Sequence, residues 1–288
     1  MRLSVAIAGK NAPGDAFVVM RGFEDSIEKA KELGFDGVEL ALKDGSELNP
    51  RRLEKTLTRT SMEVSCISTG QVFAVSGLYF THPDHTVREK TLTVFKSLID
   101  LAADFGGLVN IGRVRGQYAP DQSRQETENL FVELCRSICD HAARKNVSII
   151  LEPVNRYEVN FINSVEDGAR LVDVIGRDNL GLMPDTFHMN IEDVGIGRTL
   201  ARFGAYIKYV HFADSNRLAP GQGHIDFDEV MDGLYAASYN GWISLEILPE
   251  PDSYTAAQRA AEYVVPLIHR YNAWQESGRQ DDGLPVRR

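Results

Sequence analysis

The 288-residue sequence has only three cysteines, no long apolar run and no excess of positive charge. Cys66, Cys135 and Cys139 form no Cys-x-x-Cys pair, so the sequence indicates neither a disulfide framework nor a structural zinc site. No stretch reaches the roughly 18 apolar residues that a membrane-spanning helix needs, and the N-terminal apolar run is too short for a signal peptide. The net charge of −10 disfavours a protein that binds nucleic acid through its phosphates. We therefore expect a folded cytoplasmic protein with no membrane or nucleic-acid partner.

Short β-branched runs recur along the chain, and an amphipathic segment follows each of them. The runs begin at Leu3, Val38, Val64, Leu108, Val147, Leu180, Ile207 and Trp242. Several are continuously apolar, as in strands that are covered on both faces. Alternating strands and helices indicate a parallel sheet, either a closed (β/α)8 barrel or an open doubly wound sheet. The count of eight runs, the absence of a linker and the absence of G-x-G-x-x-G after the first run favour the barrel.

The predicted fold is thus an α/β protein, a single-domain (β/α)8 TIM barrel over residues 1–274. A length of 288 residues also fits about two domains, but barrels of about 250 residues form one. Residues 275–288 are polar and rich in turn formers, which predicts a poorly ordered tail.

Four consecutive predicted strands end in side chains that can bind a metal. They are Glu152, Asp185, His211 and Glu246. In this fold the active site lies at the carboxyl ends of the strands. One such residue could be a solvated rim group, whereas four in succession are hard to explain in that way. Three carboxylates and one imidazole favour Mn²⁺ or Mg²⁺ over a closed zinc site, and a purely structural polar network is the alternative.

Further polar side chains fall in the loops after these strands. Glu158 follows the fifth strand, His188 lies three residues after Asp185, and Arg217 lies six residues after His211. Each has a simpler interpretation by itself, since a loop arginine is usually a solvated charge and a histidine after a strand can cap the next segment. Their shared place above the predicted metal site favours contact with a substrate.

The motifs around these residues resemble those of the xylose isomerase-like barrels, and specifically of the D-tagatose 3-epimerase family. They are EPVNRYE from Glu152, PDTFHMNIED from Pro184, HFADSNRLAPGQGHIDF from His211 and SLEIL from Ser244. The first half adds STGQ from Ser68, THP from Thr81 and IGRVRG from Ile111. Together with the later motifs, these resemble the 5-keto-L-gluconate epimerase branch more than the neutral-ketose branch. The likeness extends from the first strand to the last helix.

This resemblance implies a metal-dependent carbohydrate epimerase, an isomerase acting on a ketose or a keto-sugar acid of the 5-keto-L-gluconate or D-tagaturonate type. Glu152 and Glu246 would be the catalytic pair: one removes the proton next to the ketone to give a cis-enediolate, and the other returns a proton to the opposite face. Together with Asp185 and His211 they would hold one divalent cation, Mn²⁺ by preference, with Mg²⁺, Co²⁺ and Zn²⁺ as alternatives.

The resemblance also implies that Glu158, His188 and Arg217 contact the substrate, a small sugar or sugar acid, and that the chain forms a homodimer or homotetramer. A sugar acid needs a cation for its carboxylate, and a guanidinium pairs well with that group. The candidates are Arg113, Arg115 and His82, although a surface arginine at a helix entry is an equally simple interpretation. Gln71 of the STGQ motif is a further candidate contact.

Other functions on this fold stay open. An aldose–ketose isomerase of the hydroxypyruvate isomerase type would share the paired glutamates and differ in which carbon receives the proton. An inosose dehydratase-type lyase could use the same metal site. An apurinic endonuclease would need several metals and a basic groove, which seven histidines and a charge of −10 disfavour. The non-enzymatic alternative is a metal-stabilised barrel that serves as a binding protein or scaffold.

Overall fold

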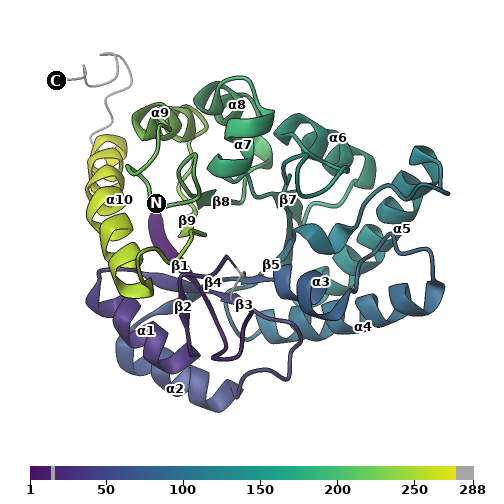
Figure 1. Cartoon of the computed structure of the whole chain (residues 1–288), viewed down its shortest axis with the longest axis horizontal. Helices are drawn as coiled ribbons and strands as arrows, with labels where there is room; N and C mark the ends of the chain where they lie inside the picture. The colour runs from purple at the N-terminus through teal and green to yellow at the C-terminus, as the bar shows by residue number, and fades with distance from the viewer. Residues whose placement is uncertain (14–16, 277–288) are drawn as a thin grey trace.

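The computed structural model describes residues 1–13 and 17–276. Their strands form one parallel sheet that curls into a ring (Figure 1). The strands are β1 (Arg2–Ala8), β2 (Met20–Arg21), β3 (Gly37–Ala41), β4 (Glu63–Ser68), β5 (Leu108–Ile111), β6 (Ser148–Leu151), β7 (Leu180–Leu182), β8 (Tyr209–Phe212) and β9 (Trp242–Leu245). The order around the ring is β7-β6-β5-β4-β3-β1-β9-β8, and the short β2 pairs with β1 outside it. All eight predicted strands are therefore confirmed.

The ring closes at a thin seam between β7 and β8. Two isolated parallel bridges join the strands there, Leu182 with Ile207 and Asp185 with His211. The Lys208 amide donates to the Leu182 carbonyl at 3.0 Å, and the His211 amide donates to the Pro184 carbonyl at 2.9 Å. Pro184 has no N–H to give, so the ladder cannot continue regularly past the end of β7. The predicted (β/α)8 barrel is confirmed, and at this seam the strands are joined by isolated bridges instead of a regular ladder.

Helices cover the outside of the ring (Figure 1). They are α1 (Phe23–Glu32), α2 (Pro50–Thr60), α3 (Gly70–Ser76), α4 (His85–Ala102), α5 (Arg124–Ala143), α6 (Val165–Ile175), α7 (Thr186–Glu192), α8 (Ile196–Arg202), α9 (Phe227–Ala236) and α10 (Ser253–Glu276), with 3₁₀ turns η1 (Arg113–Arg115) and η2 (Gly204–Tyr206). Local sequence explains where several begin. Ser123 starts α5 and Ser164 starts α6 with reciprocal capping boxes, which satisfy backbone amides that a helix leaves free.

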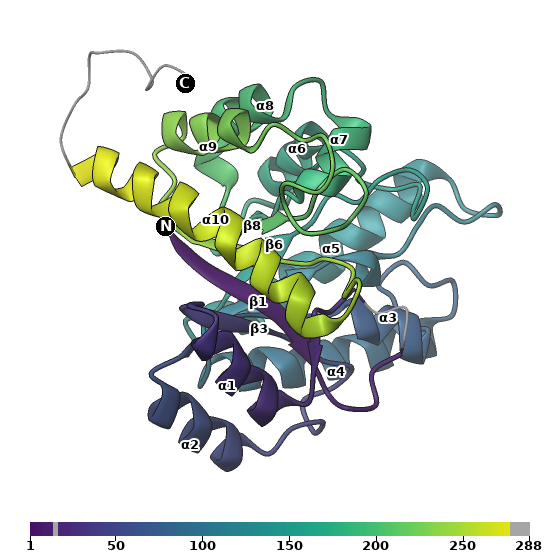
Figure 2. The same ribbon diagram turned by 60° about the vertical axis from the view of Figure 1, so that its left-hand side comes forward.

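The two ends of the described chain meet on one side of the barrel. Figure 2 shows α10 crossing beside β1, and the amino group of Met1 donates to the Asn272 side chain at 2.6 Å. Helix α10 ends at Glu276, so the first two residues of the predicted tail are helical. The rest of that tail, 277–288, lies outside the described residues. A search of the described helices finds none with the length and apolarity to cross a membrane.

Candidate metal and substrate site

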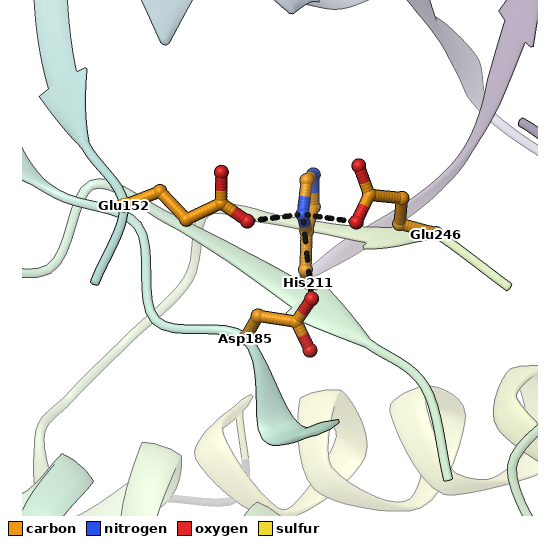
Figure 3. Close-up of side chains that lie close together, drawn as sticks. All are labelled: Glu152, Asp185, His211 and Glu246. Carbon is orange, nitrogen blue, oxygen red and sulfur yellow. Dashed lines mark ion pairs between the residues drawn. The ribbon is translucent and has the colours of Figure 1, made fainter. Parts of the chain in front are cut away.

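The four predicted metal ligands meet at the carboxyl end of the ring. Figure 3 shows the carboxylates of Glu152, Asp185 and Glu246 around the imidazole of His211. Their oxygens lie 3.6, 3.9 and 3.7 Å from His211 Nδ1, respectively. One ligand atom from each of the four residues lies within 4.8 Å of all the others. Strand order brings the four residues together, because Glu152 and Glu246 directly follow β6 and β9, His211 lies in β8, and Asp185 follows β7 by three residues.

Two buried atoms of the cluster show that it fits a cation. Asp185 Oδ2 and His211 Nδ1 have no hydrogen-bond partner within the described part of the chain. A buried polar atom left in this state costs about 1–3 kcal/mol. Burial and the neighbouring carboxylates also raise the pKa of Asp185 to about 6 and that of Glu246 to about 8, against the pull of Arg217 and His211. A divalent cation would supply the missing partner and offset the gathered negative charge.

Glu39 on β3 is a residue of the site that the sequence analysis missed. Its carboxylate is fully buried and lies 2.8 Å from His211 Nε2, and it accepts a second hydrogen bond from the Tyr209 hydroxyl at 3.0 Å. Because an ionised carboxylate only accepts, His211 Nε2 carries a proton, and Nδ1 is the nitrogen that faces the cluster. The available signal was a glutamate inside the apolar run VELAL.

Asn110 on β5, also missed, supports Glu152. The Asn110 amide donates to Glu152 Oε2 at 3.2 Å, while its oxygen accepts from the Thr69 amide at 2.9 Å. Gly112 leaves room for the same carboxylate, since a Cβ there would lie 2.7 Å from Glu152 Oε2. These contacts hold the Glu152 side chain toward the centre of the ring.

Arg217 sits in the loop after β8 with a backbone φ of 62°, in the left-handed region. The buried Asp214 carboxylate organises that loop by accepting from the amides of Ser215, Gly221 and Ile225. The Arg217 guanidinium pairs with Glu246 and lies 3.5 Å from Asp185. It stacks between the rings of Phe17 and Phe187, at 4.2 and 4.6 Å from their centroids.

His188 and Glu158 complete the polar wall beside Glu152. His188 Nε2 lies 4.0 Å from Glu152 Oε1 and 3.9 Å from Asp185 Oδ2. Burial, aided by the charge of Arg217, holds the pKa of His188 well below its usual range, so the ring is neutral. Glu158 Oε2 lies 3.8 Å from Arg113 Nη1.

A cavity opens over the cluster and gathers most of the predicted substrate contacts. Its wall includes Glu152 and Glu246 together with Gln71, Arg113, Glu158, His188 and Arg217. The Gln71 side chain is held in place by its amide, which donates to the Ala41 carbonyl at 2.6 Å. Of the two arginines after β5, Arg113 is the one that lines the cavity. Its side chain is 29% exposed, and its guanidinium lies over the Phe73 ring.

Arg115 and His82 are not among the residues that line this cavity. His82 packs against Tyr79, and its Nδ1 accepts from the Asp84 amide at 3.0 Å. Arg115 is fully buried, and its guanidinium donates to four backbone carbonyls at 2.7–3.0 Å: those of Gly112, Glu152, Phe161 and Ile162. It therefore ties the loop after β5 to the loop after β6.

We expect Arg115→Met to lower the free energy of unfolding by about 3 kcal/mol or more, because it strands buried carbonyls at about 1–3 kcal/mol each. Urea denaturation followed by circular dichroism measures the change. Arg113→Met, two residues away and partly exposed, is the matched control and should change the free energy by less than about 1 kcal/mol. Equal losses in the two variants would contradict the role assigned to Arg115.

Comparison with known proteins agrees with this architecture. The family model described as a xylose isomerase-like TIM barrel matches residues 27–264. The L-ribulose 3-epimerase of Methylomonas sp. (strain DH-1) is 30% identical over 229 residues, which cover 78% of each chain. The 3-dehydro-D-guloside 4-epimerase of Escherichia coli (strain K12) is 26% identical over 239 residues, covering 77% of this chain and 87% of that protein. A solved structure of D-allulose 3-epimerase from Methylomonas sp. superposes with a TM-score of 0.80 at 24% identity, covering 92% of this chain and 97% of that one.

These relatives carry the name epimerase, which denotes an isomerase, and they cover most of the chain. They confirm the predicted resemblance to the sugar epimerases among the xylose isomerase-like barrels and the predicted enzyme class, an isomerase. The chain belongs to the xylose isomerase-like TIM barrel family and, within it, groups with sugar epimerases.

Proposed function

We propose that the chain is a divalent-metal-dependent epimerase that inverts the carbon next to the ketone of a small ketose or keto-sugar acid. The observation that carries this proposal is the placement of Glu152 and Glu246 on opposite sides of His211 (Figure 3), both on the wall of one cavity. Inversion needs one proton acceptor on each face of the reacting carbon. Two carboxylates that approach from opposite sides and both line the cavity meet that need.

The residues divide the work as follows. Glu152, Asp185, His211 and Glu246 would hold a divalent cation, for which we propose Mn²⁺, and when bound it would supply Lewis acidity toward the ketone and the adjacent C–H. One glutamate then takes the proton from its face, and the other delivers a proton to the opposite face. The reverse reaction exchanges their roles, so one pair serves both directions.

The cavity wall orients the sugar for this exchange. Glu158, His188 and Arg217 lie beside the two glutamates and present one acceptor, one neutral imidazole and one guanidinium to the substrate oxygens. Phe17 and Phe187 hold the Arg217 plane by stacking on it, so this charge is fixed in direction. A guanidinium held in one orientation can discriminate between sugars that differ in the configuration of a hydroxyl group.

Proton NMR in D₂O tests the function. Mn²⁺-loaded protein is incubated with a panel of ketoses and keto-hexonates and removed before spectra are recorded. Deuterium at the carbon next to the ketone, together with a new ketose epimer, supports the proposal. A new aldehyde signal would replace it with an aldose–ketose isomerase, and loss of water would replace it with a lyase. No exchange with any member would remove the support for the roles of Glu152 and Glu246.

For the substrate we propose a keto-sugar acid whose carboxylate binds Arg113. This guanidinium lies on the cavity wall, and its pairing with Glu158 is long, at 3.8 Å, which leaves donors for a ligand. Charge-assisted hydrogen bonds of this kind contribute about 1.5–3 kcal/mol, so Arg113→Met should raise KM for a keto-hexonate about 10- to 100-fold. The neutral ketoses of the panel serve as the internal control, because they lack the carboxylate. An unchanged KM for the acid would exclude this role of Arg113.

A further inference from the structure

The loop after β6 places Asn155 against the ring of His188. Both side chains are buried, and Asn155 Nδ2 lies 2.8 Å from His188 Nδ1. The other ring nitrogen, Nε2, faces the carboxylates of Glu152 and Asp185. Which nitrogen carries the proton decides whether His188 donates or accepts in the cavity, because a neutral imidazole has one of each.

Two contacts fix the orientation of the Asn155 amide. The Tyr157 backbone N–H, which can only donate, lies 2.9 Å from Oδ1, so that atom is the carbonyl oxygen. On the other side, Glu158 Oε1 lies 3.4 Å from Nδ2 and accepts from it. Both contacts would be lost if the amide were turned over. The NH₂ group therefore faces His188.

The amide orientation in turn fixes the imidazole. An amide NH₂ has no lone pair to offer, so His188 Nδ1 must be the acceptor and is unprotonated. The neutral ring then carries its proton on Nε2. Glu152 Oε1 and Asp185 Oδ2, at 4.0 and 3.9 Å, are beyond hydrogen-bond reach of Nε2. Arg217 Nη1 also directs an N–H at Nε2 from 3.3 Å, a contact that by itself favours the opposite tautomer, but the Asn155 contact at 2.8 Å is the shorter of the two and sets the assignment.

We propose that Asn155 is a positioning residue that holds His188 in the Nε2–H tautomer, so that the imidazole donates a hydrogen bond to an oxygen of the substrate. The inference rests on the proposed function for the identity of the ligand, a sugar. The substrate oxygen that contacts His188 is therefore a hydrogen-bond acceptor, such as a ketone oxygen or an ionised oxygen. His188 is in that case a hydrogen-bond donor and not a base.

The Asn155→Asp variant separates control of the His188 tautomer from the hydrogen bond by which Asn155 stabilises its own loop, the one from the Tyr157 amide. Aspartate keeps an oxygen for the Tyr157 amide and nearly the same shape, but it presents an acceptor where Asn155 presents a donor. His188 should then carry a proton on Nδ1. Asn155→Ala removes both contacts and serves as the comparison for a change in the loop alone.

Two-bond ¹H–¹⁵N NMR of histidine-labelled, Mg²⁺-loaded protein reads the tautomer directly, and His188→Gln assigns the signal. In the wild type we expect His188 protonated on Nε2, and in Asn155→Asp protonated on Nδ1. With an active sugar, Asn155→Asp should lower kcat/KM about tenfold or more while the thermal midpoint and the Mn²⁺ affinity by calorimetry stay unchanged.

Three results would overturn the proposal. They are an Nδ1 proton on His188 in the wild type, an unchanged His188 signal in Asn155→Asp, and a switched tautomer with unchanged kcat/KM. The NMR measurement needs no substrate, so it is independent of the proposed function. An Nε2 proton that moves in Asn155→Asp, in a protein that exchanges no proton on any sugar, would uphold the positioning role and refute the epimerase instead.

Discussion

Glu246→Gln is expected to lower kcat for epimerisation by about 10²- to 10⁴-fold, the usual contribution of a general acid or base. The amide has nearly the shape of the carboxylate and can keep a hydrogen bond from Arg217, but it cannot take or return a proton. The assay is run at saturating Mn²⁺, with the Mn²⁺ affinity of the variant measured separately, because Glu246 also belongs to the metal cluster. Glu250→Gln, an exposed glutamate four residues further on, is the matched control.

Isotope exchange makes this prediction sharper. In Glu246→Gln, Glu152 can still remove the proton from one epimer and return deuterium to the same face. We therefore expect that epimer to exchange in D₂O without inversion, while the other epimer exchanges slowly or not at all. Glu152→Gln should show the opposite pattern. Equal exchange of both epimers in either variant would contradict the two-face mechanism.

Removing divalent cations is expected to destabilise the protein, because the empty cluster confines three carboxylates and leaves Asp185 Oδ2 and His211 Nδ1 without partners. Mn²⁺ at about 1,000 times its Kd should raise the free energy of unfolding by about 4 kcal/mol. Thermal unfolding with EDTA and then with excess Mn²⁺ measures the gain. Activity should disappear with EDTA and return with the metal.

Asp185→Asn tests whether this gain comes from the cluster. We expect the variant to lose most of the Mn²⁺ stabilisation, because an amide oxygen replaces a charged ligand at the centre of the site. Asp193→Asn is the control, since Asp193 lies in the loop after α7 and accepts from the Val165 amide instead of joining the cluster. A Mn²⁺ response that persists in full in Asp185→Asn would place the binding site elsewhere.

The strands were predictable because each is an apolar run of the length that a doubly covered strand requires. The short helices were not. Helices α3, α7 and α8 have seven residues each, about two turns, which is too short for a helical period to stand out from the sequence. The motif STGQ thus shows no sign that its last two residues begin α3.

The metal cluster was predictable for a different reason. Glu152, Asp185, His211 and Glu246 end successive strands, and the closure of the ring brings such positions together without any detail of side-chain packing. Glu39 reaches the cluster from a strand 172 residues away in sequence, and only the observed strand order shows that its side chain meets His211.

Local geometry also decided between the two arginines after β5. Arg113 and Arg115 stand two residues apart in the 3₁₀ turn η1, where about three residues complete a turn, so their side chains leave in different directions. Arg113 points to the cavity, whereas Arg115 enters the core and meets backbone carbonyls. Composition and spacing in the sequence do not distinguish the orientations of these two side chains.

The seam between β7 and β8 has a consequence for the motions of the barrel. Its backbone bonds are few, and Asp185 and His211 stand on either side of it. Local opening of a fold begins where few bonds must break, so the amides of Lys208 and His211 should exchange with solvent sooner than those inside a regular ladder such as β1–β3. Such breathing would pull the two residues apart. A cation bound by both Asp185 and His211 would hold the two strands together. Its binding could then be measured as slower hydrogen exchange of the Lys208 and His211 amides, without a substrate or a catalytic assay.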